Sequence, residues 1–121
     1  MENESILTSI KKLLGIAEEC TDFDQDLIIH INFVLMILTQ LGIGPPEGFT
    51  ITDQTSVWED FVPNIHQVSA VKTFVHLKVR LIFDPPMSTA VLESMKEILK
   101  ETEWRLVYAD RIAGREVTDD G

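Results

Sequence analysis

The chain has 121 residues, 45% of them hydrophobic, and a formal net charge of −10. This apolar content excludes a wholly disordered protein, and the length corresponds to one domain with a core of modest size. Proteins that read nucleic-acid sequence use Lys and Arg to neutralise phosphates. The charge therefore disfavours sequence-specific binding of DNA and favours a soluble protein that meets basic surfaces.

The single cysteine, Cys20, cannot form an internal disulfide, which indicates a reduced intracellular setting. Acidic neighbours disfavour its thiolate form, so we do not predict a nucleophile here. The first residues lack the basic start and the apolar core of a signal peptide. The most apolar stretch, residues 27–38, is shorter than the roughly 20 residues that a membrane-spanning helix needs, so we expect no membrane partner.

A first helix is predicted near residues 5–14, where apolar residues recur at helical spacing: Ile6, Leu7, Ile10, Leu13 and Leu14. Lys11 and Lys12 fall outside the apolar face. Gly15 then has the position of a typical helix stop.

The acidic turn that follows has the spacing of the first ligands of a calcium loop, at Asp22, Asp24 and Asp26. The positions that would need Gly and Glu hold Leu27 and Phe33 instead, so we reject a calcium site. We interpret the turn as a helix cap with carboxylates that complement the dipole of the next helix.

The second helix, predicted near residues 25–42, is apolar on nearly every side. Such a helix is covered by neighbours all round, and in so small a domain other subunits can supply part of that cover. His30 and Asn32 lie within it, without a second His or Cys at the spacing of metal ligands. We therefore interpret His30 as a polar group of the core or of an interface, and not as a metal ligand.

Residues 42–53 hold three Gly and two Pro and predict a long connection. Long loops of this kind often bind partners. Phe49 and Ile51 are apolar within it, and they either pin the loop to the core or anchor a partner. A short helix is predicted over residues 54–62, with Trp58 as an anchor in the core or in an interface.

Residues 68–83 fit both a strand, by strict alternation, and a helix with one interruption. No second stretch alternates convincingly, and a lone strand would leave its backbone unpaired. We therefore predict a helix near residues 66–83, ended by the double proline after Asp84. Ser88 then caps the most regular helix of the chain, near residues 88–108.

The predicted fold class is thus all-α, a small bundle of about four main helices with a long Gly/Pro loop. Residues 1–108 form the helical domain. The polar residues 109–121 are expected to be an extended or disordered tail that becomes ordered only on assembly. We predict no cofactor and no metal.

Three basic residues, Lys72, Lys78 and Arg80, give residues 67–86 the one positive balance in an acidic chain. In a ring of identical subunits, a basic patch on one face can meet an acidic face of the next copy. Such a head-to-tail contact closes if the rotation permits. We hypothesise that this patch contacts a neighbouring subunit or another component of the same assembly.

The order of these elements and two motifs resemble the small head–tail connector (adaptor) proteins of tailed bacteriophages. The motifs are Lys78 to Pro86, K-V-R-L-I-F-D-P-P, and Glu103 to Leu106, E-W-R-L. The resemblance extends from Ile6 to Leu106, and its motifs are structural, not catalytic. The long loop at residues 42–53 is a departure from the family pattern.

This resemblance implies a helical bundle in a ring of twelve copies, made in the host cytoplasm and docked under the portal protein in the neck of the virion. The ring would extend the DNA channel toward the tail without sequence-specific binding. The resemblance also implies that the C-terminal segment reaches the portal, with Arg111, Ile112 and Arg115 as its anchor. Loop residues would contact the next tail component, a tail-completion or stopper protein, through Phe49, Ile51 and Trp58.

Two functions remain open at the level of sequence. One is a viral structural ring protein. The other is a free-standing acidic helical module that binds a protein partner or acts as a regulator. An enzyme is not predicted, because no His, Cys, Ser or carboxylate group has the spacing of a nucleophile and its base.

Overall fold

A computed structural model describes residues 4–119, apart from the side chains of Ile65 and of residues 109–119. The described chain is helical and contains no strand, which confirms the all-α prediction. Its elements are α1 (Ile6–Leu13), α2 (Asp24–Gln40), α3 (Trp58–Phe61), α4 (Ile65–Phe83) and α5 (Thr89–Asp119). None of the helices in this part of the chain has both the length and the apolar character needed to cross a bilayer.

The helix ends follow the local signals of the sequence. The N–H of Thr8 donates to Oγ of Ser5 at 3.1 Å, which caps α1, and Gly15 after this helix has a φ of +82°. The N–H of Val91 donates to Oγ of Ser88 at 3.3 Å, so the predicted cap of α5 is confirmed. The helix cap predicted in the acidic turn is not formed. The residue before α2 is Phe23, and its side chain makes no capping hydrogen bond.

Residues 65–83 form the helix α4, so the strand alternative for this segment is wrong. Val71, Phe74, Val75 and Val79 are buried at helical spacing, and it is this face that α4 presents to the core. The helix ends at Phe83, directly before Asp84 and the two prolines, as predicted.

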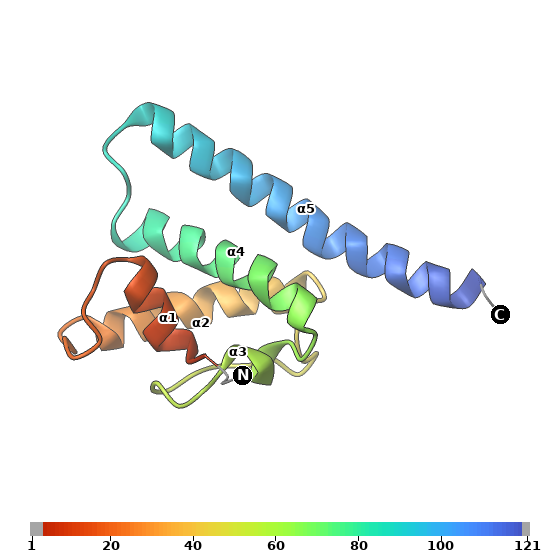
Figure 1. The fold of residues 1–121 in the computed structure, drawn as a ribbon, viewed down its shortest axis with the longest axis horizontal. Helices are drawn as coiled ribbons and strands as arrows, with labels where there is room; N and C mark the ends of the chain where they lie inside the picture. Colours follow the sequence, from red (N-terminus) through yellow and green to blue (C-terminus); the bar gives the residue numbers. More distant parts are fainter. Residues whose placement is uncertain (1–3, 120–121) are drawn as a thin grey trace.

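The helix α4 is the centre of the bundle, because it contacts α1, α2, α3 and α5. In Figure 1, α5 lies along one side of α4, and α1, α2 and α3 lie on the other sides. The largest side chains of the core are fully buried: Trp58, Phe61, Phe74, Ile6 and Leu7.

The N-terminus is tied to the segment that precedes α3. Ser5 and Val57 form an antiparallel bridge, and the N–H of Ile6 donates to the carbonyl of Ser56 at 2.9 Å. Below this bridge, Nε1 of Trp58 donates to Oγ of Ser9 at 2.8 Å. Two segments about 50 residues apart in sequence are thereby held side by side.

The C-terminal part of α5 differs from the extended backbone that the sequence suggested, because the helix continues to Asp119. No proline interrupts it, and a lone Gly114 costs only about 1 kcal/mol in a helix. Figure 1 shows α5 running past the other helices toward the C-terminus. A boundary at residue 108, with ordering only on assembly, stays a prediction.

Candidate functional site

Asn32, the polar residue in the apolar helix α2, holds the long loop. Its Nδ2 donates to the carbonyl of Ile51 at 3.0 Å, and its Oδ1 accepts from the N–H of Ile51 at 2.8 Å. This side chain thus satisfies both backbone groups of one loop residue, as a neighbouring strand would. The partner of Asn32 could not be predicted from the sequence, because the two residues are 19 positions apart.

Replacement of Asn32 by Ala should lower the free energy of unfolding by about 1–3 kcal/mol, because the amide and carbonyl of Ile51 lose their partners. Chemical denaturation measures this loss. Thr50→Ala, which changes an exposed neighbour in the same loop, is the control and should stay within about 0.5 kcal/mol of wild type. Equal stability of the two variants would contradict the role of Asn32.

The three residues expected to contact a tail component are mostly core residues. Ile51 and Trp58 are buried, so Ile51 pins the loop to the core, the first of the two alternatives. The ring of Phe49 lies 5.6 Å from that of Phe61, centroid to centroid, and its side chain is partly exposed. Of the three, only Phe49 has a side chain placed for the predicted contact, which stays a prediction.

Lys72, Lys78 and Arg80 do not form one patch, which corrects the expectation from the sequence. Each residue turns a helix by about 100°, so Lys78 and Arg80 point to nearly opposite sides of α4. Lys72 forms an ion pair with Glu4 of the same chain. Nζ of Lys78 lies 5.7 Å from the centroid of the Phe74 ring. A role for each residue in an interface stays a prediction.

The side chains of the other predicted portal anchors, Arg111, Ile112 and Arg115, lie outside the described part.

Arg80 lies one turn from His76 on α4. Nε of Arg80 and Nε2 of His76 are buried and make no hydrogen bond within the described residues. Burial, and then the positive charge of Arg80, lowers the pKa of His76 from its ordinary value of 6.5.

Stability should therefore fall as the pH drops below about 6.5, because the unfolded chain takes up a proton on His76 before the folded chain does. The loss should grow until the pH reaches the lowered pKa of the folded state. His76→Gln removes this contribution and should flatten the fall. Denaturation curves between pH 7.5 and 5 test this, and an unchanged pH dependence in the variant would contradict it.

Lys11 is buried, although its position in the sequence lies outside the apolar face of α1. Its Nζ donates to the carbonyl of Glu18 at 2.9 Å and lies 2.9 Å from Oδ1 of Asp24. The acidic turn is thus fastened to α1 by one lysine. Among the described residues, no three His, Cys, Asp or Glu side chains gather as metal ligands would.

The outer face of α2 carries an uncovered apolar row, which we name the α2 stripe: Ile29, Phe33 and Met36. Their exposed fractions are 64%, 50% and 46%. The spacing of four and three residues puts them on one side of the helix, and the exposed carboxylate of Asp26 lies one turn before them. A second exposed carboxylate, Asp22, lies in the turn that precedes α2. The opposite face of α2 is buried, at Leu27, Ile31, Val34, Leu35 and Leu38. This face and the stripe together explain why the sequence of the helix is apolar on nearly every side.

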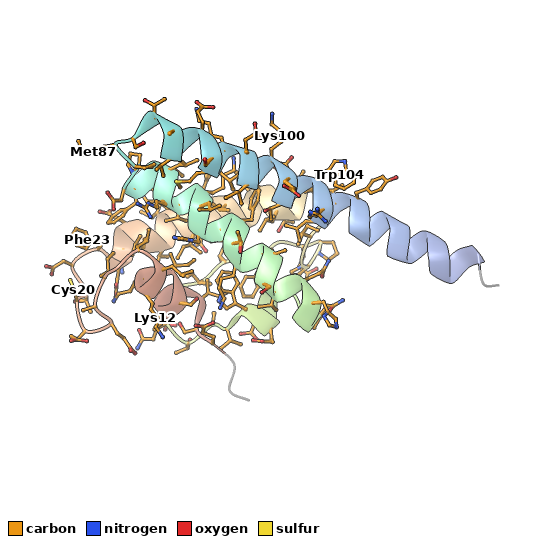
Figure 2. The ribbon with its side chains drawn as sticks, turned by 45° about the horizontal axis from the view of Figure 1, so that its top comes forward. Lys12, Cys20, Phe23, Met87, Lys100 and Trp104 are labelled. Carbon is orange, nitrogen blue, oxygen red and sulfur yellow. The ribbon has the colours of Figure 1, made fainter. Side chains whose placement is uncertain are left out.

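A groove follows the flank of α5. Two hollows, of about 340 and 410 Å³, adjoin each other along this flank and share Lys100 and Glu103 as lining residues. We name this the α5 groove, defined at one end by Lys78, Lys96 and Lys100, and at the other by Leu41, Trp104 and Tyr108. Figure 2 shows Lys100 and Trp104 on the outer side of α5.

The aromatic end of the α5 groove is apolar and open to solvent. Trp104 is 58% exposed, and its ring stacks on that of Tyr108 with centroids 4.6 Å apart and an interplanar angle of 20°. An exposed tryptophan on a rigid helix is a typical anchor of a protein interface. The α2 stripe and the α5 groove are therefore the two candidate interaction surfaces of this chain.

A family model described as phage connector protein matches residues 6–111. The chain belongs to the phage connector protein family. The match spans the whole bundle and confirms the resemblance seen in the sequence. It favours the viral structural protein over a free-standing regulatory module.

Membership in the connector family gives this protein a structural role in the neck of a phage particle, where head and tail components assemble. No curated protein and no solved structure matched the chain. The connector role therefore rests on the family match, and the contacts that this member makes have to be argued from its own surfaces.

Proposed function

We propose that this connector forms a ring of identical subunits that docks on the portal and extends the DNA channel toward the tail. The ring would join the portal on one side and a tail-completion or stopper protein on the other. The resemblance to connector proteins suggests twelve copies.

The observation that carries this proposal is the uncovered α2 stripe. A row of three large apolar side chains is about half exposed in the isolated chain, with the aromatic pair of α5 exposed as well. Soluble monomers seldom leave such rows in water, and larger apolar surfaces mark sites of association. A ring subunit needs two such surfaces, one for each neighbour.

The charge supports a passage for DNA. The net charge of −10 reflects 20 Asp and Glu against 10 Lys and Arg, and this acidic excess disfavours binding of phosphates. DNA can therefore pass through the ring without binding to it. This differs from a DNA-binding collar, in which Lys and Arg line the hole.

Electron microscopy of purified particles, with the connector labelled by a small fusion, tests the assignment. The label should appear as a ring between portal and tail, and heads made without this protein should fail to join tails. Label on the capsid shell or at the tail tip would overturn the proposal.

Deletion of residues 110–121 tests the proposed docking on the portal. The shortened chain keeps every residue that is buried among the side chains that the structure describes, so it should stay helical and soluble. It should fail to join heads that carry the portal, because the segment with Arg111, Ile112 and Arg115 is gone. If the shortened chain joins heads as well as the full chain does, the C-terminal segment has no role in docking.

A further inference from the structure

We propose that neighbouring subunits meet by packing the α2 stripe of one copy into the α5 groove of the next. This inference rests on the proposed ring and names the two surfaces that build it. The partner in the groove is a second copy of this chain.

The two surfaces complement each other in shape and polarity. The α2 stripe is a convex row on a helix, with Phe33 in its middle. The α5 groove is hollow, and its aromatic end presents Trp104 and Tyr108. An amphipathic helix laid into a groove, with anchors at i, i+4 and i+7, is a recurring mode of recognition.

Their charges are opposite and stand at matching ends. Asp26 lies one turn before the α2 stripe, and Asp22 lies in the turn that precedes α2. Lys96 lines the basic end of the α5 groove, and Lys100 follows it one turn later. All four side chains are exposed in the single chain. Acidic groups of one copy would therefore meet basic groups of the next, as in other complementary interfaces.

The lengths agree when the two helices run in the same direction. At about 1.5 Å per residue, α2 rises about 15 Å from Asp26 to Met36. By the same rule, α5 rises about 18 Å from Lys96 to Tyr108. With Asp26 beside Lys96, Phe33 and Met36 fall at the level of the aromatic pair of the groove, and Ile29 falls at the level of Lys100.

Three other apolar residues, Ile82, Val91 and Ile98, are also half exposed, but they form a less suitable binding surface for the α2 stripe. Beside Ile98 stand Glu97 and Glu101, and Glu101 is already paired with Arg105 at 2.8 Å. This surface would repel the acidic end of the stripe. The α5 groove is the better partner because its basic end, with Lys78, Lys96 and Lys100, would attract Asp26, while Glu103 lies further along α5 toward the aromatic end.

When the α2 stripe of one subunit packs into the α5 groove of the next, the pair still has one free α5 groove and one free α2 stripe. The contact is therefore heterologous and adds copies in one rotational sense until the ring closes. Two identical surfaces would stop at a dimer.

Cross-linking inside assembled particles tests the contact. Phe33→Cys and Trp104→Cys are introduced together with Cys20→Ser, and particles are treated with a short bis-maleimide. A ladder of dimers, trimers and larger multimers is expected on a denaturing gel. The matched control pairs Phe33→Cys with Met87→Cys, because Met87 is fully exposed and lies apart from Trp104 on α5 (Figure 2). This control should give no ladder.

The outcomes separate the contact from the ring itself. A ring in particles without a ladder, or with cross-linked dimers alone, overturns the inference and leaves the proposed function standing. Absence of the wild-type chain from purified particles overturns the proposed function, and the inference with it.

Charge reversal gives a second test, which does not depend on cysteine chemistry. Lys96→Glu with Lys100→Glu should reduce joining to heads at least about tenfold, because like charges would face each other. Adding Asp22→Lys and Asp26→Lys to the same chain should restore joining. The control reversal, Glu47→Lys, lies on the exposed loop and should have no effect. Loss without rescue would mean that the lysines contact another component, which contradicts the inference.

Discussion

Trp58→Ala should destabilise the chain by about 3–5 kcal/mol, the usual cost of removing a large aromatic side chain from a core. Trp58 has no exposed surface, and its Nε1 donates to Oγ of Ser9 on α1 at 2.8 Å. The substitution leaves a large cavity and removes this hydrogen bond in one step. Thermal and chemical denaturation followed by circular dichroism measure the loss.

Two milder variants separate these contributions. Ser9→Ala keeps the indole and removes only its acceptor, so it should cost about 0.5–1.5 kcal/mol, or somewhat more if the buried N–H is left unpaired. Trp58→Phe keeps most of the apolar volume and should lie between Ser9→Ala and Trp58→Ala. If Trp58→Ala costs no more than Ser9→Ala, the packing described for Trp58 is wrong.

Gly44→Ala should destabilise the chain by about 2–5 kcal/mol, through backbone strain and overpacking together. Gly44 has a φ of +84°, which an L-residue adopts at a cost of about 1–2 kcal/mol. An added Cβ would also stand 2.5 Å from Cε1 of Phe61, whose ring is buried and packed near Phe49. Because that ring has little room to move, overpacking should add about 1–3 kcal/mol.

Gly48→Ala is the matched control for this prediction. Gly48 has a similar φ of +98°, but an added Cβ meets no atom within 4 Å. It should therefore show the backbone cost alone, and the difference between the two variants isolates the contact with Phe61. Equal losses would mean that Phe61 moves aside freely.

The helices could be predicted from the sequence because their boundaries depend on neighbours in the chain. Ser88 and the double proline after Asp84 act within one helical turn, so no knowledge of the fold was needed to interpret them. The choice of helix over strand for α4 could also be made from the sequence, because it depended only on the absence of a second stretch that could serve as a partner strand.

Contacts between distant segments could not be predicted in this way. Asn32 pairs with Ile51 across 19 positions, and the indole of Trp58 reaches Ser9 across 49. The sequence shows that these residues are unusual in their surroundings, but not which groups they meet. The burial of Lys11 could not be predicted either, because it depends on where the acidic turn folds back onto α1.

The prediction of one basic patch, formed by Lys72, Lys78 and Arg80, failed for a different reason. Charges were summed along the chain, while a helix separates Lys78 from Arg80 by about 200° of rotation. The true basic group spans two helices and joins Lys78 to Lys96 and Lys100. The spacing of four between the last two was visible in the sequence, but their closeness to α4 was not.

The expectation that other subunits cover part of α2 stays a prediction, and the α2 stripe shows where such cover would lie. The large apolar residues of α5 recur at helical spacing but divide into two groups in the structure. Met95, Leu99 and Leu106 are buried, while Val91 and Ile98 are half exposed. One helix, α4, covers only one side of α5, so the width of the apolar row in the sequence exceeds what the bundle can bury.

The bridge between Ser5 and Val57 has a consequence for the order in which the chain folds during synthesis. The first helix leaves the ribosome early, but its partners Ser56 and Trp58 emerge about 50 residues later, and the buried residues of α4 later still. An eight-residue helix is not stable alone in water. The nascent chain therefore stays without its core until Val79 has emerged, and a chaperone that binds exposed apolar segments has that whole interval in which to act.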